Sequence, residues 1–213
     1  MFSDVDRFEF FPTLIWKFQV EPEERPGLNA ALSTEITRLV GDRSTTPAGG
    51  TWQTDQNLHE NPVFAPLAQM IHDAALNALT DLELDNQDIA ITGCWANVNP
   101  PGAQHIRHNH PNNFLSGSYY VTAGAGGDQI KFSDPRGQTS VMAPPTQNRN
   151  RFNSNNVLMP VVEGDLVMFP GWLDHEVPIN QSGADRVSVA FNVMFRNYGE
   201  AMSRPMWKGT AGG

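Results

Sequence analysis

The sequence predicts an α+β fold, mainly β, in which two N-terminal helices pack on one face of a β-structure. Apolar residues at helical spacing are confined to the part before Asp88. After Asp88, short strands follow one another, separated by Gly, Pro, Asn and Asp turns. Such strands are typical of a sandwich or barrel, and helices that precede a run of strands favour a separate helical layer. With 213 residues, 39% of them hydrophobic, the chain can bury a sizeable core.

The chain is expected to form a single domain over 1–213, in which residues 1–88 hold an N-terminal strand and supporting helices. Aromatic and β-branched residues indicate the strand, Pro22 and Pro26 then break the chain, and the periodicity of apolar residues indicates the helices. The predicted elements are a strand over 8–20, a helix over 28–40 that ends at Gly41, a turn-rich link over 44–50 and a helix over about 62–82.

Residues 89–196 are expected to form the β core, followed by a C-terminal tail over 197–213. The predicted strands cover 89–98, 115–122, 129–133, 166–169, 176–179 and 186–195. Residues 134–160 have no apolar period. A connection of this length is usually functional or disordered, so it is interpreted either as a hairpin tip or as a lid that contacts the substrate.

Composition excludes several classes of partner. The net charge of −9 and the lack of a basic stripe argue against nucleic acid. The single cysteine, Cys94, excludes an intrachain disulfide and fits a reducing compartment. The N-terminus carries Asp4, Asp6 and Arg7 before any apolar run, unlike a signal peptide, and no stretch approaches the length of a membrane span. We therefore expect a cytoplasmic protein with no nucleic-acid or membrane partner, while its oligomeric state cannot be read from the sequence.

Three histidines suggest a metal site. In an extended backbone, His108 and His110 share one face, because side chains alternate with period two. The distant His175 would complete a set of three, and imidazole suits iron, zinc, copper and nickel. A His-x-His pair alone is a weak signal, but this one lies between Pro100-Pro101-Gly102 and Pro111, near a strand end.

Arg186 begins a strand with nearly complete alternation. Arg186 and Ser188 share one face, and the opposite face, with Val187, Val189, Phe191 and Val193, must be core. The polar face lines either solvent or a pocket, where Arg186 would offer a planar fork to a carboxylate. Among possible carboxylate ligands, Asp128 and Asp134 are more easily turn residues, and Asp174 should point away from His175 if that segment is extended.

An ordered set of motifs gives the chain a family resemblance over about residues 89–196. The set comprises His108-x-His110-Pro111, Leu115-Ser116-Gly117-Ser118-Tyr119-Tyr120-Val121, Gly126-Gly127-Asp128-Gln129-Ile130-Lys131-Phe132, Gly164-Asp165-Leu166-Val167-Met168-Phe169-Pro170, His175-x-Val177-Pro178 and Arg186-Val187-Ser188. In this order it resembles the iron(II)/2-oxoglutarate-dependent dioxygenases, in particular a prolyl-4-hydroxylase-like branch with His-x-His-Pro and Leu-Ser-Gly-x-Tyr-Tyr.

The resemblance implies a double-stranded β-helix, the cupin-like jelly roll of two facing sheets, with the N-terminal helices packed on one sheet. It also implies iron(II) on His108, the residue at 110, and His175. Arg186 would bind the distal carboxylate of the cosubstrate 2-oxoglutarate, assisted by Ser188 and by Tyr119 or Tyr120. The commoner family pattern has Asp or Glu where this chain has His110, so either three neutral ligands hold the metal or a carboxylate such as Asp128 or Asp134 takes the second position.

The leading functional hypothesis is therefore a dioxygenase that consumes dioxygen and 2-oxoglutarate, hydroxylates an unidentified substrate, and releases succinate and CO2. One alternative is a cupin-like three-histidine metalloenzyme that does not use 2-oxoglutarate, since such a set also suits zinc and an activated water. The other is a non-catalytic jelly-roll binding protein. Arg186 favours the first hypothesis because its guanidinium requires an anionic partner.

Overall fold

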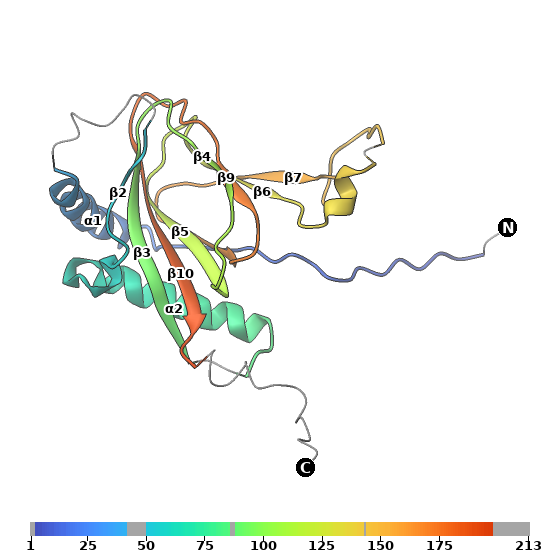
Figure 1. Ribbon diagram of the computed structural model, residues 1–213, viewed down its shortest axis with the longest axis horizontal. Coiled ribbons are helices and arrows are strands. Elements are labelled where there is room, and N and C mark those ends of the chain that lie inside the picture. Colours follow the sequence, from blue (N-terminus) through green and yellow to red (C-terminus); the bar gives the residue numbers. More distant parts are fainter. Residues whose placement is uncertain (1–2, 42–49, 86–87, 143, 198–213) are drawn as a thin grey trace, which may run out of the picture.

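A computed structural model describes residues 3–41, 50–85, 88–142 and 144–197. Within these ranges the chain forms a six-stranded sheet in the order β1-β8-β5-β10-β3-β2 and a four-stranded sheet in the order β4-β9-β6-β7. Every strand pair is antiparallel. The two sheets face each other, and helices α1 and α2 cover the outer face of the larger one (Figure 1). This is an α+β, mainly β, jelly roll of the predicted kind.

The described elements have the following bounds. The strands are β1 (Trp16–Gln19), β2 (Trp52–Gln53), β3 (Ile89–Asn99), β4 (His105–His108), β5 (Leu115–Thr122), β6 (Gln129–Ser133), β7 (Asn156–Pro160), β8 (Asp165–Pro170), β9 (His175–Val177) and β10 (Arg186–Phe195). The helices are α1 (Arg25–Val40) and α2 (Ala65–Asp81), with short 3-10 turns η1 (Leu58–Glu60), η2 (Pro62–Phe64) and η3 (Gly137–Ser140).

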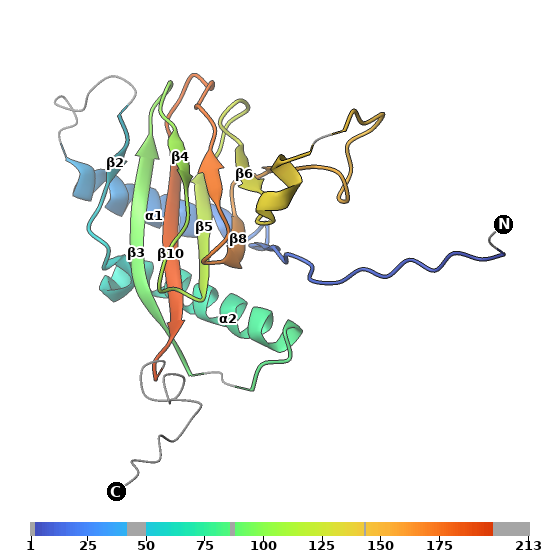
Figure 2. The ribbon, with the colours of Figure 1, turned by 45° about the vertical axis from the view of Figure 1, so that its right-hand side comes forward.

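The central strands coincide with their prediction. Strands β5, β6 and β10 have the predicted bounds, and β10 lies between β5 and β3 in the larger sheet (Figure 2). Helix α1 ends, as predicted, at Gly41, whose φ of 56° suits a residue without a Cβ. Pro26, however, does not precede this helix but lies in its first turn, where a missing N–H removes no helical bond.

Several segments depart from the predicted elements. The strand over 8–20 is reduced to β1, because Phe8, Phe10 and Phe11 extend into solvent and Phe11 is 95% exposed. Strand β7 lies within the predicted 134–160 connection, and β4 was not predicted as a strand. The link over 44–50 lies, apart from Gly50, outside the described residues, and so does the tail over 197–213 apart from Asn197.

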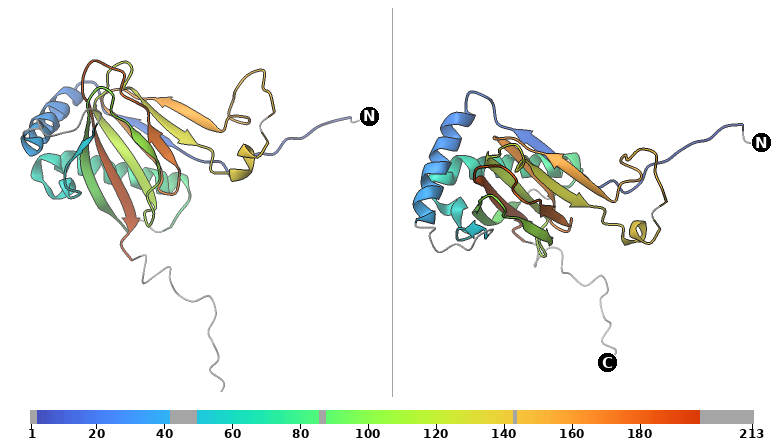
Figure 3. Two further views of the ribbon diagram at one scale, coloured as in Figure 1. Left: turned by 45° about the horizontal axis from the view of Figure 1, so that its top comes forward. Right: turned by 90° about the horizontal axis from the view of Figure 1, so that it is seen from above.

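Two apolar layers position the site. The larger lies between the six-stranded sheet and the helices and includes Ile71 of α2 with Val189 and Phe191 of β10 (Figure 3). The smaller lies between the two sheets, where Tyr120 of β5 and Phe169 of β8 meet Phe132 of β6. The polar face of β10 is therefore turned towards the four-stranded sheet, because its apolar face packs against the helices.

The N-terminal part contributes strands as well as helices. Strands β1 and β2 form the two edges of the six-stranded sheet. Lys17 of β1 pairs through Nζ with Oδ2 of the buried Asp165 of β8 at 2.6 Å, which fixes one of these edges. Among the described residues, no helix combines the length and apolarity that crossing a membrane requires.

Candidate active site

His108, His110 and His175 come together between the sheets. His108 is the last residue of β4 and is directly opposite His175, the first residue of β9. A ring nitrogen from each of the three lies within 4.8 Å of the others. The sequence predicted that His108 and His110 lie on one strand, but β4 ends at His108. His110 follows the strand, and its backbone N–H donates to the Gly171 carbonyl at 2.8 Å, which brings its ring to the same place.

Backbone carbonyls fix the orientation of two of these rings. Nδ1 of His108 lies 2.7 Å from the Ile106 carbonyl, and Nδ1 of His175 lies 2.9 Å from the Leu173 carbonyl. A carbonyl oxygen can only accept, so each Nδ1 carries the proton. Nε2 of both rings is then left with a free lone pair for a metal, which is the usual arrangement of ligating histidines.

Burial keeps two of the three rings uncharged at neutral pH. Burial, opposed by the Leu173 hydrogen bond, lowers the pKa of His175 to about 4. Burial and the nearby His108 lower the pKa of His110 to about 4. Neutral imidazole is the form that binds a metal ion, so this donor set fits a divalent cation without prior loss of protons.

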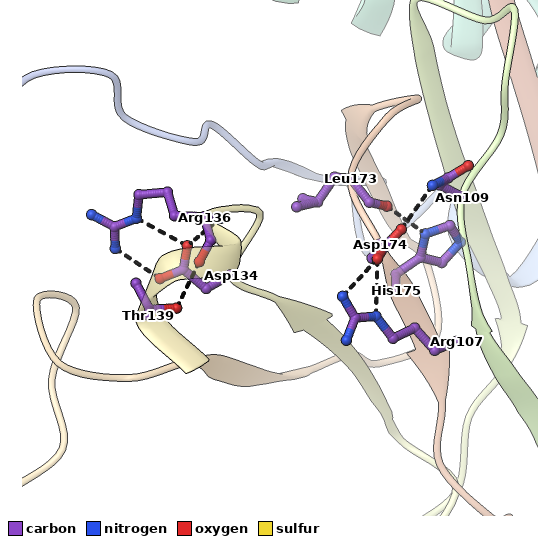
Figure 4. Close-up of polar contacts among 8 residues, drawn as sticks. All are labelled: Arg107, Asn109, Asp134, Arg136, Thr139, Leu173, Asp174 and His175. Carbon is purple, nitrogen blue, oxygen red and sulfur yellow. Dashed lines mark hydrogen bonds and ion pairs between the residues drawn. The ribbon is translucent and has the colours of Figure 1, made fainter. Parts of the chain in front are cut away.

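The candidate carboxylates lie elsewhere. Asp134 binds Arg136 through both of its carboxylate oxygens, at 3.0 and 2.8 Å, and Asp128 accepts the Gly126 N–H at 3.0 Å (Figure 4 shows the Asp134 pair). Asp174 binds Arg107, which lowers the pKa of the Asp174 carboxyl. The group of three histidines in the described part of the chain contains no carboxylate. The geometry therefore favours His110 over Asp128 and Asp134 as the second ligand.

Arg186 is a buried cation with unused donors. Its side chain is only 2% exposed, and Nε and Nη1 have no hydrogen-bond partner among the residues that the structure describes. Burial lowers the pKa of Arg186, and the nearby Tyr120 opposes that shift. A buried guanidinium without partners is costly, so this position fits an anion such as a carboxylate.

Ser188 and one of the two tyrosines Tyr119 and Tyr120 were predicted to assist Arg186. Ser188 and Tyr120 lie directly opposite each other on β10 and β5, and both are buried on the face that meets the four-stranded sheet. Tyr119 does not reach this face. It packs in the helix-side core, and its hydroxyl donates to Oδ1 of Asn29 on α1 at 2.6 Å. The structure thus places Tyr120, and not Tyr119, beside Arg186, because successive residues of a strand point to opposite faces.

Sequence reasoning did not single out the polar wall beside the histidines. The Trp95 ring lies 6.0 Å from that of His110, and Nε2 of Gln53 donates to Oδ1 of Asn97 at 2.7 Å. Trp95 and Asn97 alternate on β3 with Ala96 and Val98, which pack in the helix-side core. The same alternation is visible in the sequence and could have placed both residues on the interior face.

The fold is a jelly roll, and its interior brings together three histidines that could hold a metal ion and a buried arginine that could bind an anion. No curated protein sequence matches the chain. Residues 93–192 match a family described as "Putative 2OG-Fe(II) oxygenase". The matched residues include His108, His110, His175 and Arg186, so over this part of the chain the sequence is similar to that oxygenase family.

Solved structures share the fold at low sequence identity. A prolyl-4-hydroxylase from Pseudomonas putida superposes with a TM-score of 0.58 at 17% identity, over 86% of this chain and 94% of that one. A 2OG-Fe(II) oxygenase family oxidoreductase from Burkholderia pseudomallei gives 0.59 at 12% identity, over 86% of each chain. HygX from Streptomyces hygroscopicus, with nickel, 2-oxoglutarate and hygromycin B bound, gives 0.58 at 15%, over 85% of this chain and 82% of that one.

Proposed function

We propose that the protein hydroxylates a C–H bond of an organic substrate, with iron(II) held by His108, His110 and His175 and 2-oxoglutarate held by Arg186. The observation that carries this proposal is the buried Arg186 guanidinium with two unpartnered nitrogens, which lies on the interior face that also receives the three histidines. With both groups bound, the site would couple the four-electron reduction of dioxygen to two two-electron oxidations: one oxygen atom would enter succinate as 2-oxoglutarate loses CO2, and the other would enter the substrate C–H bond.

Each residue has a physical task in this proposal. The Nδ1–H bonds of His108 and His175 aim their Nε2 atoms at the cation. Arg186 orients the distal carboxylate of 2-oxoglutarate through charge-assisted hydrogen bonds. The hydroxyls of Ser188 and Tyr120, which are buried opposite each other on β10 and β5, would supply further hydrogen bonds to the same carboxylate. Phe169, whose ring lies 4.6 Å from that of His175, keeps water away from that ligand.

The wall beside His110 suggests where the substrate binds. Trp95 offers an aromatic surface, and the Gln53–Asn97 pair offers amide groups. We propose that the substrate is an organic molecule that contacts these uncharged groups. Nucleic acid remains disfavoured by the net charge of −9, and we propose a cytoplasmic location, which fits the single, buried Cys94.

The decisive experiment measures succinate formation by purified protein supplied with iron(II), 2-oxoglutarate and oxygen. We expect slow succinate formation even without a substrate, and its loss in His175→Ala with an unchanged circular dichroism spectrum. His72→Ala, on α2, is the matched control and should keep the wild-type rate. Tight metal binding that is indifferent to 2-oxoglutarate would instead support the three-histidine metalloenzyme, and retained succinate formation in His175→Ala would contradict the ligand assignment.

A further inference from the structure

The residues between the histidines make a set of contacts of their own. Arg107 and Asn109 alternate with His108 and His110, and Asp174 directly precedes His175. The Asp174 carboxylate accepts from Arg107 Nε and Nη2 at 2.9 and 2.7 Å on Oδ2, and from Asn109 Nδ2 at 2.8 Å on Oδ1 (Figure 4). One carboxylate therefore joins the segment that carries His108 and His110 to the segment that carries His175.

Backbone pairing alone holds these two segments loosely. Strand β4 has four residues and β9 has three, and their register shifts between His105 and His108. Strand β4 is also an edge of the four-stranded sheet, so among the described strands β9 alone pairs with it. His110 lies beyond the end of β4. The distances among the three rings therefore depend on contacts other than the strand ladder.

The Arg107–Asp174 pair is poorly placed to stabilise the whole protein. The side chains of Arg107 and Asp174 are 56% and 30% exposed, and ion pairs at such positions contribute little to the free energy of unfolding. The two hydrogen bonds from one guanidinium to a single carboxylate oxygen nevertheless fix the direction of the Asp174 side chain. The contacts of Asp174 with Arg107 and Asn109 therefore act locally, on the two segments that carry the histidines.

We propose that Asp174, together with Arg107 and Asn109, is a positioning clamp that holds His108, His110 and His175 ready for the metal. The inference rests on the proposed function of the histidines as ligands. A preformed ligand set binds a metal more tightly than one that must be ordered during binding, and loss of an outer partner of metal ligands typically weakens metal binding by about 10- to 100-fold.

The chain offers a matched control on the other side of His175. Glu176 is also an acidic neighbour of His175, but its carboxylate binds Lys131 Nζ of β6 at 2.7 Å and, among the described residues, forms no hydrogen bond or ion pair with β4. Glu176→Gln therefore removes a negative charge next to the same ligand without breaking the clamp. A general effect of charge would weaken metal binding in both Asp174→Ala and Glu176→Gln. Loss of the clamp would weaken it, of these two variants, only in Asp174→Ala.

The test is calorimetric titration of Co(II) into metal-free wild-type protein, Asp174→Ala, Arg107→Ala, Asn109→Ala and Glu176→Gln. We expect Kd to rise about 10- to 100-fold in Asp174→Ala, and Kd to stay within about threefold of wild type in Glu176→Gln. The double variant Arg107→Ala/Asp174→Ala should bind no more weakly than Asp174→Ala, because the two residues act as one unit. Arg107→Lys should recover only part of the affinity. The visible spectrum of bound Co(II) should change in the clamp variants alone.

Two results would overturn the proposal: an unchanged Kd in Asp174→Ala, or an equal loss of affinity in Glu176→Gln. If Asp174→Ala does not fold, Asn109→Ala and Asp174→Asn decide the question, and Kd values equal to wild type in both would also overturn it. Failure of the dioxygenase proposal has a different signature. Wild-type protein would then bind Co(II) but form no succinate with iron(II) and 2-oxoglutarate, while the affinity differences among the clamp variants could still be measured.

Discussion

At the scale of single residues, the site depends on groups that are costly to bury unless a ligand compensates them. Arg186 is such a group, because its charge is withdrawn from water and two of its nitrogens have no partner in the described part of the chain. The sequence could indicate this residue, because alternation along 186–195 puts a single arginine on a face opposite four core residues. It could not show that the guanidinium is buried, since burial depends on the facing sheet.

Arg186→Ala should weaken 2-oxoglutarate binding far more than metal binding. A charge-assisted contact is worth roughly 1.5–3 kcal/mol, which corresponds to about 10- to 150-fold in affinity. Arg186→Lys should recover only part of the loss, because an ammonium group cannot make the planar two-point contact. Calorimetric titration of 2-oxoglutarate into the metal-loaded wild type and both variants measures this. Equal affinities in all three proteins would make Arg186 a structural strand residue.

His175 should make the metal-free protein sensitive to mild acid. Burial lowers the pKa of His175 in the folded state to about 4, from an ordinary value of 6.5. Between these values the unfolded chain binds a proton that the folded protein does not, so the free energy of unfolding falls as pH decreases from about 6.5 to 4. We expect His175 alone to account for about 2–3 kcal/mol between pH 7 and pH 4.5.

Urea unfolding of metal-free wild type and His175→Gln at both pH values measures this contribution. The variant lacks the titrating ring, so its unfolding free energy should decline less between pH 7 and pH 4.5. Metal-loaded wild type should lose metal over the same range, because protons compete for the ligand nitrogens. Identical declines in the two metal-free proteins would mean that the His175 ring titrates normally.

At the scale of elements, alternation along a strand separates residues that look equivalent in the sequence. Tyr119 and Tyr120 are adjacent on β5, yet one hydroxyl binds Asn29 of α1 and the other residue lies opposite Ser188 in the intersheet core. The sequence predicted the bounds of β5, but it could not tell which face met the helices. That depends on the packing of β10 and α1 against the sheet. The sequence was equally unable to show that His110 lies beyond the end of β4 and still reaches the site.

The two tyrosines should therefore respond differently to loss of the hydroxyl. Tyr120→Phe should weaken 2-oxoglutarate binding, by a few-fold to about tenfold, with little change in stability, because one hydrogen bond contributes about 0.5–1.5 kcal/mol. Tyr119→Phe should leave that affinity unchanged and lower the free energy of unfolding by about 1 kcal/mol, since Asn29 loses its partner. Calorimetry and urea unfolding of both variants measure the two effects. A weaker 2-oxoglutarate affinity in Tyr119→Phe would contradict the assignment of faces.

At the scale of the whole molecule, the helix-side core and the intersheet core have different roles. We propose that the chain folds as one domain, because the N-terminal part supplies both edge strands of the larger sheet and the helices that cover it. The sequence predicted this division through a change in periodicity near Asp88. It did not predict the exposed course of Phe8–Phe11, because aromatic residues satisfy a strand pattern whether or not a neighbouring strand exists.

The separation of the layers predicts that stability and ligand binding can be changed independently. Ile71 of α2 is fully buried in the helix-side core, and the histidines lie between the sheets on the other face of the larger sheet. Ile71→Ala should lower the free energy of unfolding by about 2–5 kcal/mol, because it removes buried methyl groups and leaves a cavity. Val141→Ala, at a position that is 84% exposed, is the control and should change it by about 0.5 kcal/mol or less.

Both variants should keep the wild-type Kd for 2-oxoglutarate when it is measured on metal-loaded protein well below the unfolding temperature. Binding should also raise the unfolding temperature of Ile71→Ala, because metal and cosubstrate bind the folded state and shift the equilibrium towards it. In the double variant with Arg186→Ala, the effects on stability and on affinity should add, since the two residues lie in different layers. Weaker 2-oxoglutarate binding in Ile71→Ala, at a temperature where it is fully folded, would mean that the helical layer sets the geometry of the site through the strands of the larger sheet.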